Sequence, residues 1–235
     1  EPRRWYWHAQ RIGLMVWQDF VSPDKFAGSI PDAVAQRQLD EGAAMIAARR
    51  QFGGITTWVT YNEGWGLDGR APDQPGIGAA WARAHDVAYM RGSGRLVDAC
   101  TGCDANGAGD AIDIHHYSPP PTSFAYNASM EHLAFASLGE FGGVGLGIAD
   151  HSWVAGKCHG YATVSDSNAL TATYETYCDT LAADVHIGLS AAVYTQTSDC
   201  ERECNGVLTY DRQPKTVQSR WAAASKRVLD AAAQV

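Results

Sequence analysis

Short apolar segments alternate along this chain with longer segments of helical spacing, and this alternation is what most restricts the fold. The apolar segments are bounded by turn residues, which predicts strands at 13–20, 55–62, 95–100, 111–117, 135–141 and 188–196. Helices are predicted at 29–54, 80–92, 167–184 and 213–233. Strands that alternate with helices favour parallel β-α units, and therefore an α/β fold of the (β/α) barrel type. A doubly wound sheet also fits, but no glycine-rich nucleotide fingerprint follows the first strand.

Two of the predicted strands end on a glutamate that glycine follows closely. The stretch "TTWVTYNEGWG" (56–66) places Glu63 at the end of one strand, and "FASLGEF" (135–141) places Glu140 at the end of another. In a (β/α) barrel the carboxyl ends of the strands meet around one active site. Hydrolysis of a glycosidic bond needs two carboxyl groups, one as proton donor and one as nucleophile or base. A solvated strand end explains either glutamate alone, but the shared pattern favours a catalytic pair.

The charge and apolar patterns exclude some classes of partner. The net charge is −8 and no long basic run occurs, which disfavours nucleic acid because phosphate binding needs clustered Lys and Arg. No apolar stretch reaches the roughly 18 to 20 residues of a membrane span. Eight Trp and ten Tyr are many for this length, and they serve either a large core or platforms for ligand rings. We therefore expect neither nucleic acid nor a membrane span.

The cysteines indicate an oxidising compartment. They are even in number, with Cys158, Cys178 and two close pairs, Cys100/Cys103 and Cys200/Cys204. Together with the glycosylation sequon at Asn127, they favour disulfides and a secreted or extracellular glycoprotein. A four-cysteine zinc site is the alternative, but the second pair lacks C-x-x-C spacing. Which cysteines pair cannot be deduced from the sequence.

The segment "AIDIHHY" (111–117) brings chemistry-bearing side chains to one strand face. Side chains alternate along a strand, so Asp113, His115 and Tyr117 share a face and His116 lies on the other. If Tyr117 faces the site, His115 does so too, and it is therefore a candidate substrate contact. Adjacent histidines suggest a metal, but opposite faces make joint ligation awkward and no H-E-x-x-H motif is present. We therefore predict neither a metal nor another cofactor.

Five stretches resemble the catalytic barrel of glycoside hydrolase family 2, which contains β-galactosidases, β-glucuronidases and β-mannosidases. They are "RWYWHAQRIGLMVWQDF", "WVTYNEGWG", "DIHHYSPPP", "SLGEFGGVGL" and "YTQTSDCERECNGVLTYDR", in family order over almost the whole chain. The combination of "NEGWG" with "GEFGG" is the specific part of the resemblance. It implies a retaining β-glycosidase that acts on a carbohydrate by double displacement.

The resemblance also implies roles for individual residues. Glu63, in the position of the family's Asn-Glu motif on the fourth strand, would be the general acid/base, and Glu140 on the seventh strand would be the nucleophile. Asn62 would hydrogen-bond the 2-hydroxyl of the sugar, and Tyr117 would lie beside the nucleophile. Trp153, in "DHSW" after the seventh strand, is a candidate stacking platform for a sugar ring; the alternative is ordinary core or loop packing.

The chain also differs from the family pattern. Family members have an eight-stranded barrel preceded by β-sandwich domains, whereas this single 235-residue domain begins, by resemblance, in the helix before the third strand. We therefore expect a partial barrel of strands three to eight, which an additional chain or segment completes. Cys200 and Cys204 would staple a loop that relatives leave unstapled. The alternative function is a non-catalytic glycan-binding or structural component of an extracellular assembly.

Overall fold

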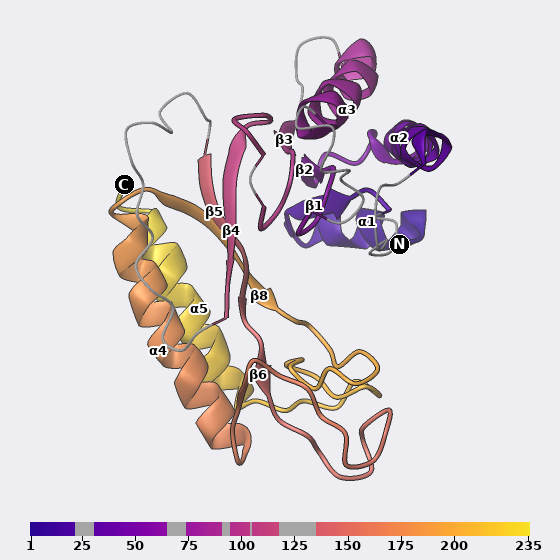
Figure 1. Cartoon of the computed structure of the whole chain (residues 1–235). Helices are drawn as coiled ribbons and strands as arrows, with labels where there is room; N and C mark the ends of the chain where they lie inside the picture. Colours follow the sequence, from indigo (N-terminus) through magenta and orange to yellow (C-terminus); the bar gives the residue numbers. More distant parts are fainter. Residues whose placement is uncertain (22–30, 65–73, 91–94, 104, 118–134) are drawn as a thin grey trace. The chain divides into compact units, whose positions relative to one another are not determined.

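A computed structural model describes residues 1–21, 31–64, 74–90, 95–103, 105–117 and 135–235. The chain divides into two compact units, of which the first holds the described residues up to 113 and the second the described residues from 114 onward. The division falls within strand β4, and each unit has its own sheet and its own helices (Figure 1).

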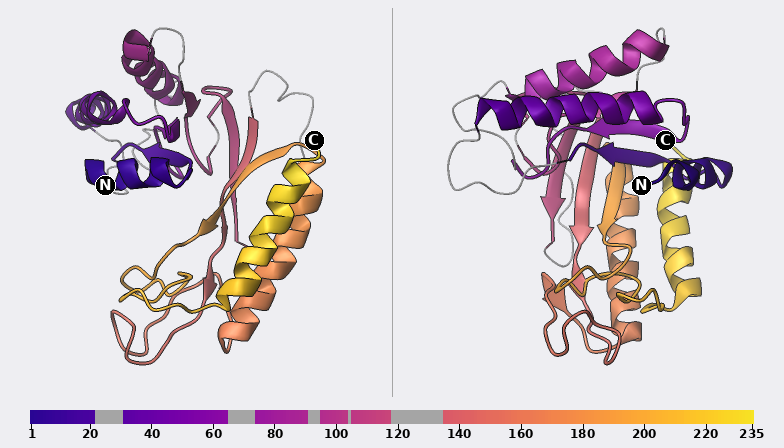
Figure 2. Two further views of the ribbon diagram at one scale, coloured as in Figure 1. Left: turned by 180° about the vertical axis from the view of Figure 1, so that it is seen from behind. Right: turned by 90° about the vertical axis from the view of Figure 1, so that its right-hand side faces the viewer.

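The first unit is built on a parallel three-stranded sheet. Its elements are α1 (Arg3–Arg11), β1 (Val16–Asp19), α2 (Asp32–Arg49), β2 (Ile55–Val59), α3 (Gln74–Met90) and β3 (Leu96–Asp98). The strand order is β1-β2-β3, and both strand pairs are parallel. Parallel neighbours need a crossover connection, and here the helices α2 and α3 lie in the two connections. The two helices pack side by side (Figure 2).

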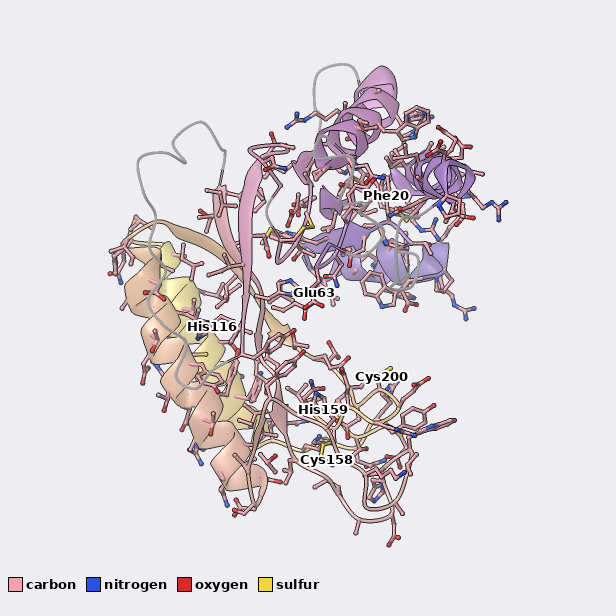
Figure 3. All side chains as sticks on the ribbon, viewed as in Figure 1. Phe20, Glu63, His116, Cys158, His159 and Cys200 are labelled. Atoms are coloured by element: carbon pink, nitrogen blue, oxygen red, sulfur yellow. A yellow bond between two sulfur atoms is a disulfide. The ribbon has the colours of Figure 1, made fainter. Side chains whose placement is uncertain are left out.

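Apolar side chains from the sheet and from α2 form the core of the first unit. Trp58 on β2, Val97 on β3 and Ile46 on α2 are completely buried and belong to one cluster. Gly42 lets α2 approach the ring of Phe20 (labelled in Figure 3), because a methyl group at Gly42 would lie 2.1 Å from that ring. The core therefore depends on a close contact that any larger residue at this helix position would break.

The second unit is a three-stranded sheet with two helices and long loops. Its elements are β4 (Ala111–His116), β5 (Phe135–Gly142), β6 (Val144–Gly145), β7 (Ala162–Thr163), α4 (Ser167–Val185), β8 (Leu189–Thr195) and α5 (Gln218–Ala232). The main sheet has the order β4-β5-β8, and β6 pairs with β7. The helices α4 and α5 lie side by side (Figure 1), with the ring of Tyr174 stacked on Trp221 at 3.4 Å between centroids.

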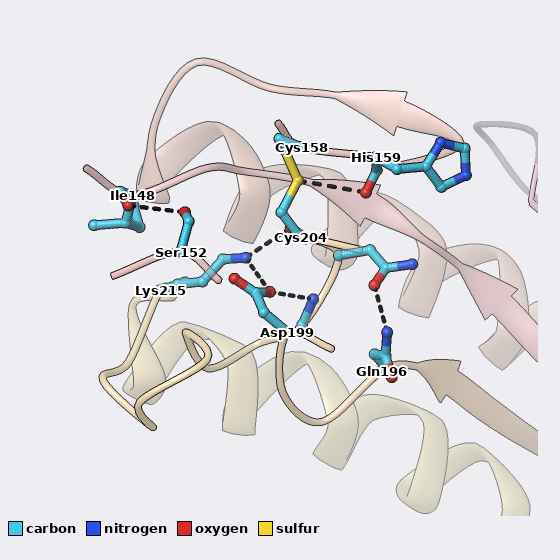
Figure 4. Close-up of a disulfide and its surroundings, with 10 residues drawn as sticks. Ile148, Ser152, Cys158, His159, Gln196, Asp199, Cys204 and Lys215 are labelled. Carbon is cyan, nitrogen blue, oxygen red and sulfur yellow. Dashed lines mark hydrogen bonds and ion pairs between the residues drawn. A yellow bond between two sulfur atoms is a disulfide. The ribbon is translucent and has the colours of Figure 1, made fainter. Parts of the chain in front are cut away.

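Two loops of the second unit are joined by the Cys158–Cys204 disulfide (Figure 4). Beside it the completely buried Lys215 donates hydrogen bonds to Asp199 Oδ1 and to the Cys204 carbonyl, each at 2.7 Å. The expectation that Cys200 and Cys204 staple a loop is therefore wrong. Cys200 is free and exposed, because the chain makes a tight turn there and Cys204 points to Cys158 instead.

The remaining cysteines differ between the two units. Cys100 and Cys103 in the first unit form the second disulfide, which spans three positions. Cys178 is free and buried within α4. The sequon at Asn127 lies outside the described residues.

The strand and helix predictions can be compared with these elements. All six predicted strands are present, most of them with shorter bounds, and α2, α3, α4 and α5 lie within or overlap the predicted helices. The class is mixed α/β. Among the described strands, two three-stranded sheets and one two-stranded pair are formed, and no closed barrel. In the parts of the chain that can be placed, no helix is both long and apolar enough to span a membrane.

Candidate active site

The carboxylate of Glu140 lies at the centre of a polar and aromatic cluster in the second unit. Glu140 is near the carboxyl end of β5, and its side chain is partly exposed. The hydroxyl of Tyr117 donates a hydrogen bond to Glu140 Oε2, and His115 Nε2 lies 3.8 Å from Oε1. The prediction that His115 and Tyr117 share one strand face is confirmed, since both reach the same carboxylate.

His116, on the opposite face of the strand, has a different environment. Its Nε2 is buried and has no hydrogen-bond partner among the described residues (the residue is labelled in Figure 3). The alternation along β4 therefore separates the two adjacent histidines, as the sequence predicts.

The glycines after Glu140 allow aromatic rings to pack against the chain. Gly142 and Gly143 have φ of 87° and 61°, in the left-handed region that favours glycine. A methyl group at Gly143 would lie 2.5 Å from the ring of Tyr161 and 2.8 Å from that of Tyr117. Gly143, the last residue of "GEFGG", is thus favoured by the backbone conformation and required by the rings that flank the carboxylate.

Tyr161 is a member of this cluster that the sequence did not reveal. Its ring stacks on Tyr117 with centroids 3.6 Å apart and planes 4° from parallel, and its backbone N–H donates to the Gly143 carbonyl at 2.9 Å. The side chain is 51% exposed, so the stack presents aromatic surface to solvent. A single tyrosine in the loop "HGYAT" carries no periodic signal that would distinguish it from other loop residues.

Asn62 and Glu63 follow the carboxyl end of β2 in the first unit. The backbone hydrogen bonds between β2 and β3 continue past the ends of both strands. Thr101 N donates to the Tyr61 carbonyl at 3.0 Å, and Glu63 N donates to the Thr101 carbonyl at 2.9 Å. Glu63 (labelled in Figure 3) has φ of 50°, and Gly64 has φ of 75°. A left-handed non-glycine residue costs about 1 kcal/mol or more, and such residues cluster at functional sites.

The structure places Glu63 and Glu140 in different units. Glu63 lies beyond the end of β2 and directly before Gly64, whereas Glu140 lies within β5, two positions before Gly142. That the two side chains converge on one sugar linkage stays a prediction.

Two buried carboxyl groups lie next to the segment of Glu63. Asp98 ends β3, and burial followed by the negative charge of Asp113 raises the pKa of Asp98 to about 8. Asp113 Oδ1 accepts hydrogen bonds from the Thr101 hydroxyl at 2.8 Å and from the Gly102 N–H at 3.0 Å. The sequence pattern predicts which strand face Asp113 occupies. It predicts no role for Asp98, because nothing in the sequence distinguishes this residue from an ordinary strand end.

Trp153 lies on a loop of the second unit and is 56% exposed. Its ring contacts Tyr210 with centroids 4.8 Å apart and planes at 47°. The neighbouring His151 Nδ1 lies 2.8 Å from Asp211 Oδ2, which joins the same two loops. The exposed indole excludes core packing, and its contact with Tyr210 is the loop packing of the alternative. The role of Trp153 as a stacking platform stays a prediction.

Comparison with solved structures identifies the fold. The β-glucuronidase of Parabacteroides merdae is similar over 92% of this chain and 30% of its own, with 17% identity and a TM-score of 0.58. A GH2 β-galacturonidase from Eisenbergiella tayi is similar over 96% of this chain and 42% of its own, with 12% identity and a TM-score of 0.55. The β-D-mannosidase of Dictyoglomus thermophilum is similar over 99% and 33%, with 14% identity and a TM-score of 0.57.

These similarities show that the chain shares its fold with part of each of these glycosidases. The chain spans less than half the length of each of these three structures. No protein-family model matches the sequence, and no match is found among curated proteins. The fold thus agrees with the resemblance that the motifs carry.

Proposed function

We propose that the chain is a retaining β-glycosidase, or the catalytic part of one, that hydrolyses O-glycosidic bonds by double displacement. Glu140 attacks the anomeric carbon and forms a glycosyl-enzyme intermediate, while Glu63 protonates the departing oxygen. Glu63 then removes a proton from the water that releases the sugar. The chemistry needs no metal and no other cofactor.

The observation that carries this proposal is the hydrogen bond from Tyr117 to Glu140, with His115 beside the same carboxylate. A nucleophilic carboxylate must be ionised and held in one orientation, and a phenol donor supports both. A solvated strand end needs neither an aligned donor nor a stacked aromatic wall. The partly exposed Glu140 remains accessible to a substrate.

The roles of the remaining site residues follow from the same proposal. Asn62 hydrogen-bonds the 2-hydroxyl of the sugar that occupies the site, next to Glu63. Tyr161 and Trp153 offer exposed ring faces on which a pyranose stacks, since its C–H groups pack well against an aromatic ring. The six predicted strands, which are β1 to β5 and β8, would then be the third to eighth strands of a (β/α) barrel that a further segment or chain completes.

Mechanism-based labelling tests the proposal. The protein is incubated with aryl β-glucuronide, β-galacturonide, β-galactoside and β-mannoside substrates, and with the corresponding 2-deoxy-2-fluoro glycosyl fluorides. We expect turnover of at least one substrate, and a covalent label on the peptide that contains Glu140. Glu140→Ala abolishes the label, and Glu63→Ala lowers turnover by about 10²- to 10⁴-fold. Glu41→Gln, at an exposed position of α2, is the matched control.

A folded protein that neither turns over nor takes the label would refute the enzymatic proposal. That outcome favours the alternative, a glycan-binding or structural component of an extracellular assembly. The short span of the chain relative to the solved glycosidases makes this the relevant second outcome.

We also propose that the protein is secreted or extracellular, on the basis of its two disulfides. Alkylation then gives a defined count of thiols. The native protein reacts at Cys200 alone, the unfolded but unreduced protein at Cys178 as well, and the reduced protein at all six cysteines. Six reactive thiols in the unreduced, unfolded protein would contradict the assignment.

A further inference from the structure

Two buried carboxyl groups in the first unit have a proton arrangement that the proposed reaction does not use. Asp98 is 1% exposed and Asp113 is 6% exposed. Asp98 Oδ1 accepts a hydrogen bond from the Cys100 N–H at 3.0 Å. Asp98 Oδ2 is buried and has no hydrogen-bond partner among the described residues. A buried carboxyl oxygen without a donor is costly when the group is ionised, so this oxygen is the one that carries a proton.

The surrounding charges favour the same arrangement. Burial comes first among the causes that raise the pKa of Asp98 to about 8, followed by Asp113 on β4, with Asp19 at the end of β1 acting in the same direction. The Cys100 N–H acts in the opposite direction and lowers the pKa. Asp113 accepts two hydrogen bonds and is suited to be the ionised member. At neutral pH the pair therefore carries one proton and one negative charge.

Thr101 links this pair to Glu63. Its hydroxyl donates to Asp113 Oδ1 at 2.8 Å, while its backbone N–H and carbonyl bond the carbonyl of Tyr61 and the N–H of Glu63. Thr101 lies inside the Cys100–Cys103 disulfide, which closes the loop around it. Two hydrogen bonds through Thr101 thus connect the buried carboxylate of Asp113 to the peptide of Glu63.

Glu63 needs such support because of its backbone. A φ of 50° is unfavourable for a glutamate and persists only where the surrounding structure holds it. The Thr101 carbonyl accepts from the N–H of Glu63 itself, so this bond helps to hold the backbone of Glu63.

We propose that Asp98 and Asp113 act together as positioning residues for Glu63, which they hold through Thr101 with one proton between the two carboxyl groups. The inference rests on the proposed function, in which Glu63 is the general acid/base. Neither carboxyl group touches the substrate. Their effect is to keep the Glu63 carboxyl group aligned with the departing oxygen.

The first test uses Thr101→Val, which keeps the shape of the side chain and removes the hydroxyl donor. A misplaced acid/base slows the cleavage of poor leaving groups, which need protonation, more than that of good ones. We expect kcat/KM to fall about 10- to 100-fold for phenyl β-glycosides and less than about 3-fold for dinitrophenyl β-glycosides. Thr101→Ser restores the phenyl rate, and Thr56→Val on β2 is the matched control. Equal losses on both substrates would overturn the proposal.

The second test is independent of activity and measures hydrogen exchange at the amide of Glu63. In Thr101→Val and in Asp113→Ala this amide loses protection by about 10-fold or more, whereas Thr56→Val leaves it unchanged. An unchanged amide in both variants refutes the positioning role even if the enzyme is active. Loss of protection in a protein without any glycosidase activity refutes the proposed function and leaves the positioning of Glu63 intact.

The third test addresses the proton. Asp98→Asn keeps the acceptor for the Cys100 N–H and cannot ionise. In the wild-type protein, protection of the Glu63 amide, corrected for intrinsic exchange, falls between about pH 7 and pH 9, because a second negative charge forms beside Asp113. Asp98→Asn retains its protection across that range. The same fall in both proteins would show that the proton on Asp98 has no part in the positioning.

Discussion

Replacement of Lys215 by methionine should strongly destabilise the second unit. The ammonium group of Lys215 is completely buried and donates to Asp199 Oδ1 and to the Cys204 carbonyl, each at 2.7 Å (Figure 4). Asp199 Oδ1 also accepts from the Gly206 N–H at 2.9 Å, and Asp199 Oδ2 has no partner among the described residues. Lys215→Met therefore leaves a buried negative charge with a single backbone donor.

The expected magnitude follows from the cost of an unpaired buried charge. Removal of one partner of such a pair costs about 3 to 5 kcal/mol of unfolding free energy. A chain of this size loses about 2 to 4 °C in Tm for each kcal/mol, so the expected decrease is about 6 to 20 °C. Lys226→Met is the control, since Lys226 pairs with Asp230 on the exposed face of α5 and such pairs contribute at most about 0.5 kcal/mol.

A second substitution tests whether the charge is the cause. Asp199→Asn keeps the acceptor for the Gly206 N–H and removes the charge, so Lys215→Met/Asp199→Asn should be more stable than Lys215→Met alone. Urea titrations and thermal melts of the three variants measure the difference. The reasoning is refuted if Lys215→Met costs less than about 1 kcal/mol, or if the second substitution adds a further loss.

Three other outcomes are expected. The pKa of Asp98 is raised from 3.8 to about 8, so between about pH 5 and 7 the folded state binds a proton that the unfolded state has lost, and the unfolding free energy of the wild type falls by about 1.4 kcal/mol per pH unit. Asp98→Asn lacks this dependence, so in urea titrations its unfolding free energy relative to wild type should rise by about 1.4 kcal/mol for each pH unit. Gly42→Ala should cost about 1 to 3 kcal/mol through its clash with Phe20, and Phe20→Leu should cost less in the Gly42→Ala background than in wild type; additive costs would contradict the clash. Tyr161→Ala should raise KM for aryl glycosides without preventing labelling of Glu140, and an unchanged KM would remove Tyr161 from the substrate site.

The strands of the fold were predictable because each has its own local signal. An apolar run rich in β-branched residues, as in 55–59, buries its side chains wherever a sheet forms, and glycine or a polar cluster marks its end. The two-residue strands β6 and β7 have no such signal, since their pairing depends on loops that meet only in the folded chain. The presence of a strand can thus be predicted from local sequence, whereas the partner with which it pairs cannot.

The candidate site divides in the same way. Strand alternation predicts that His115 shares a face with Tyr117, whereas the place of Tyr117 beside Glu140 was implied by the family resemblance. The pairing of Cys158 with Cys204 spans 46 positions and connects two irregular loops, so no spacing rule indicates it. Tyr161 likewise enters the site only because its loop returns to the Gly143 carbonyl.

The glycines of "GEFGG" connect the sequence motif to the chemistry of the carboxylate. Asparagine also tolerates the left-handed conformation, so the backbone alone does not explain why position 143 is glycine. The rings of Tyr161 and Tyr117 supply the missing reason, because each comes within 3 Å of where a side chain at Gly143 would begin. A larger residue would displace these rings, and with them the Tyr117 hydroxyl, which donates a hydrogen bond to Glu140. The glycine at position 143 therefore meets a packing requirement of the aromatic stack. Through that stack it also supports the orientation of the proposed nucleophile.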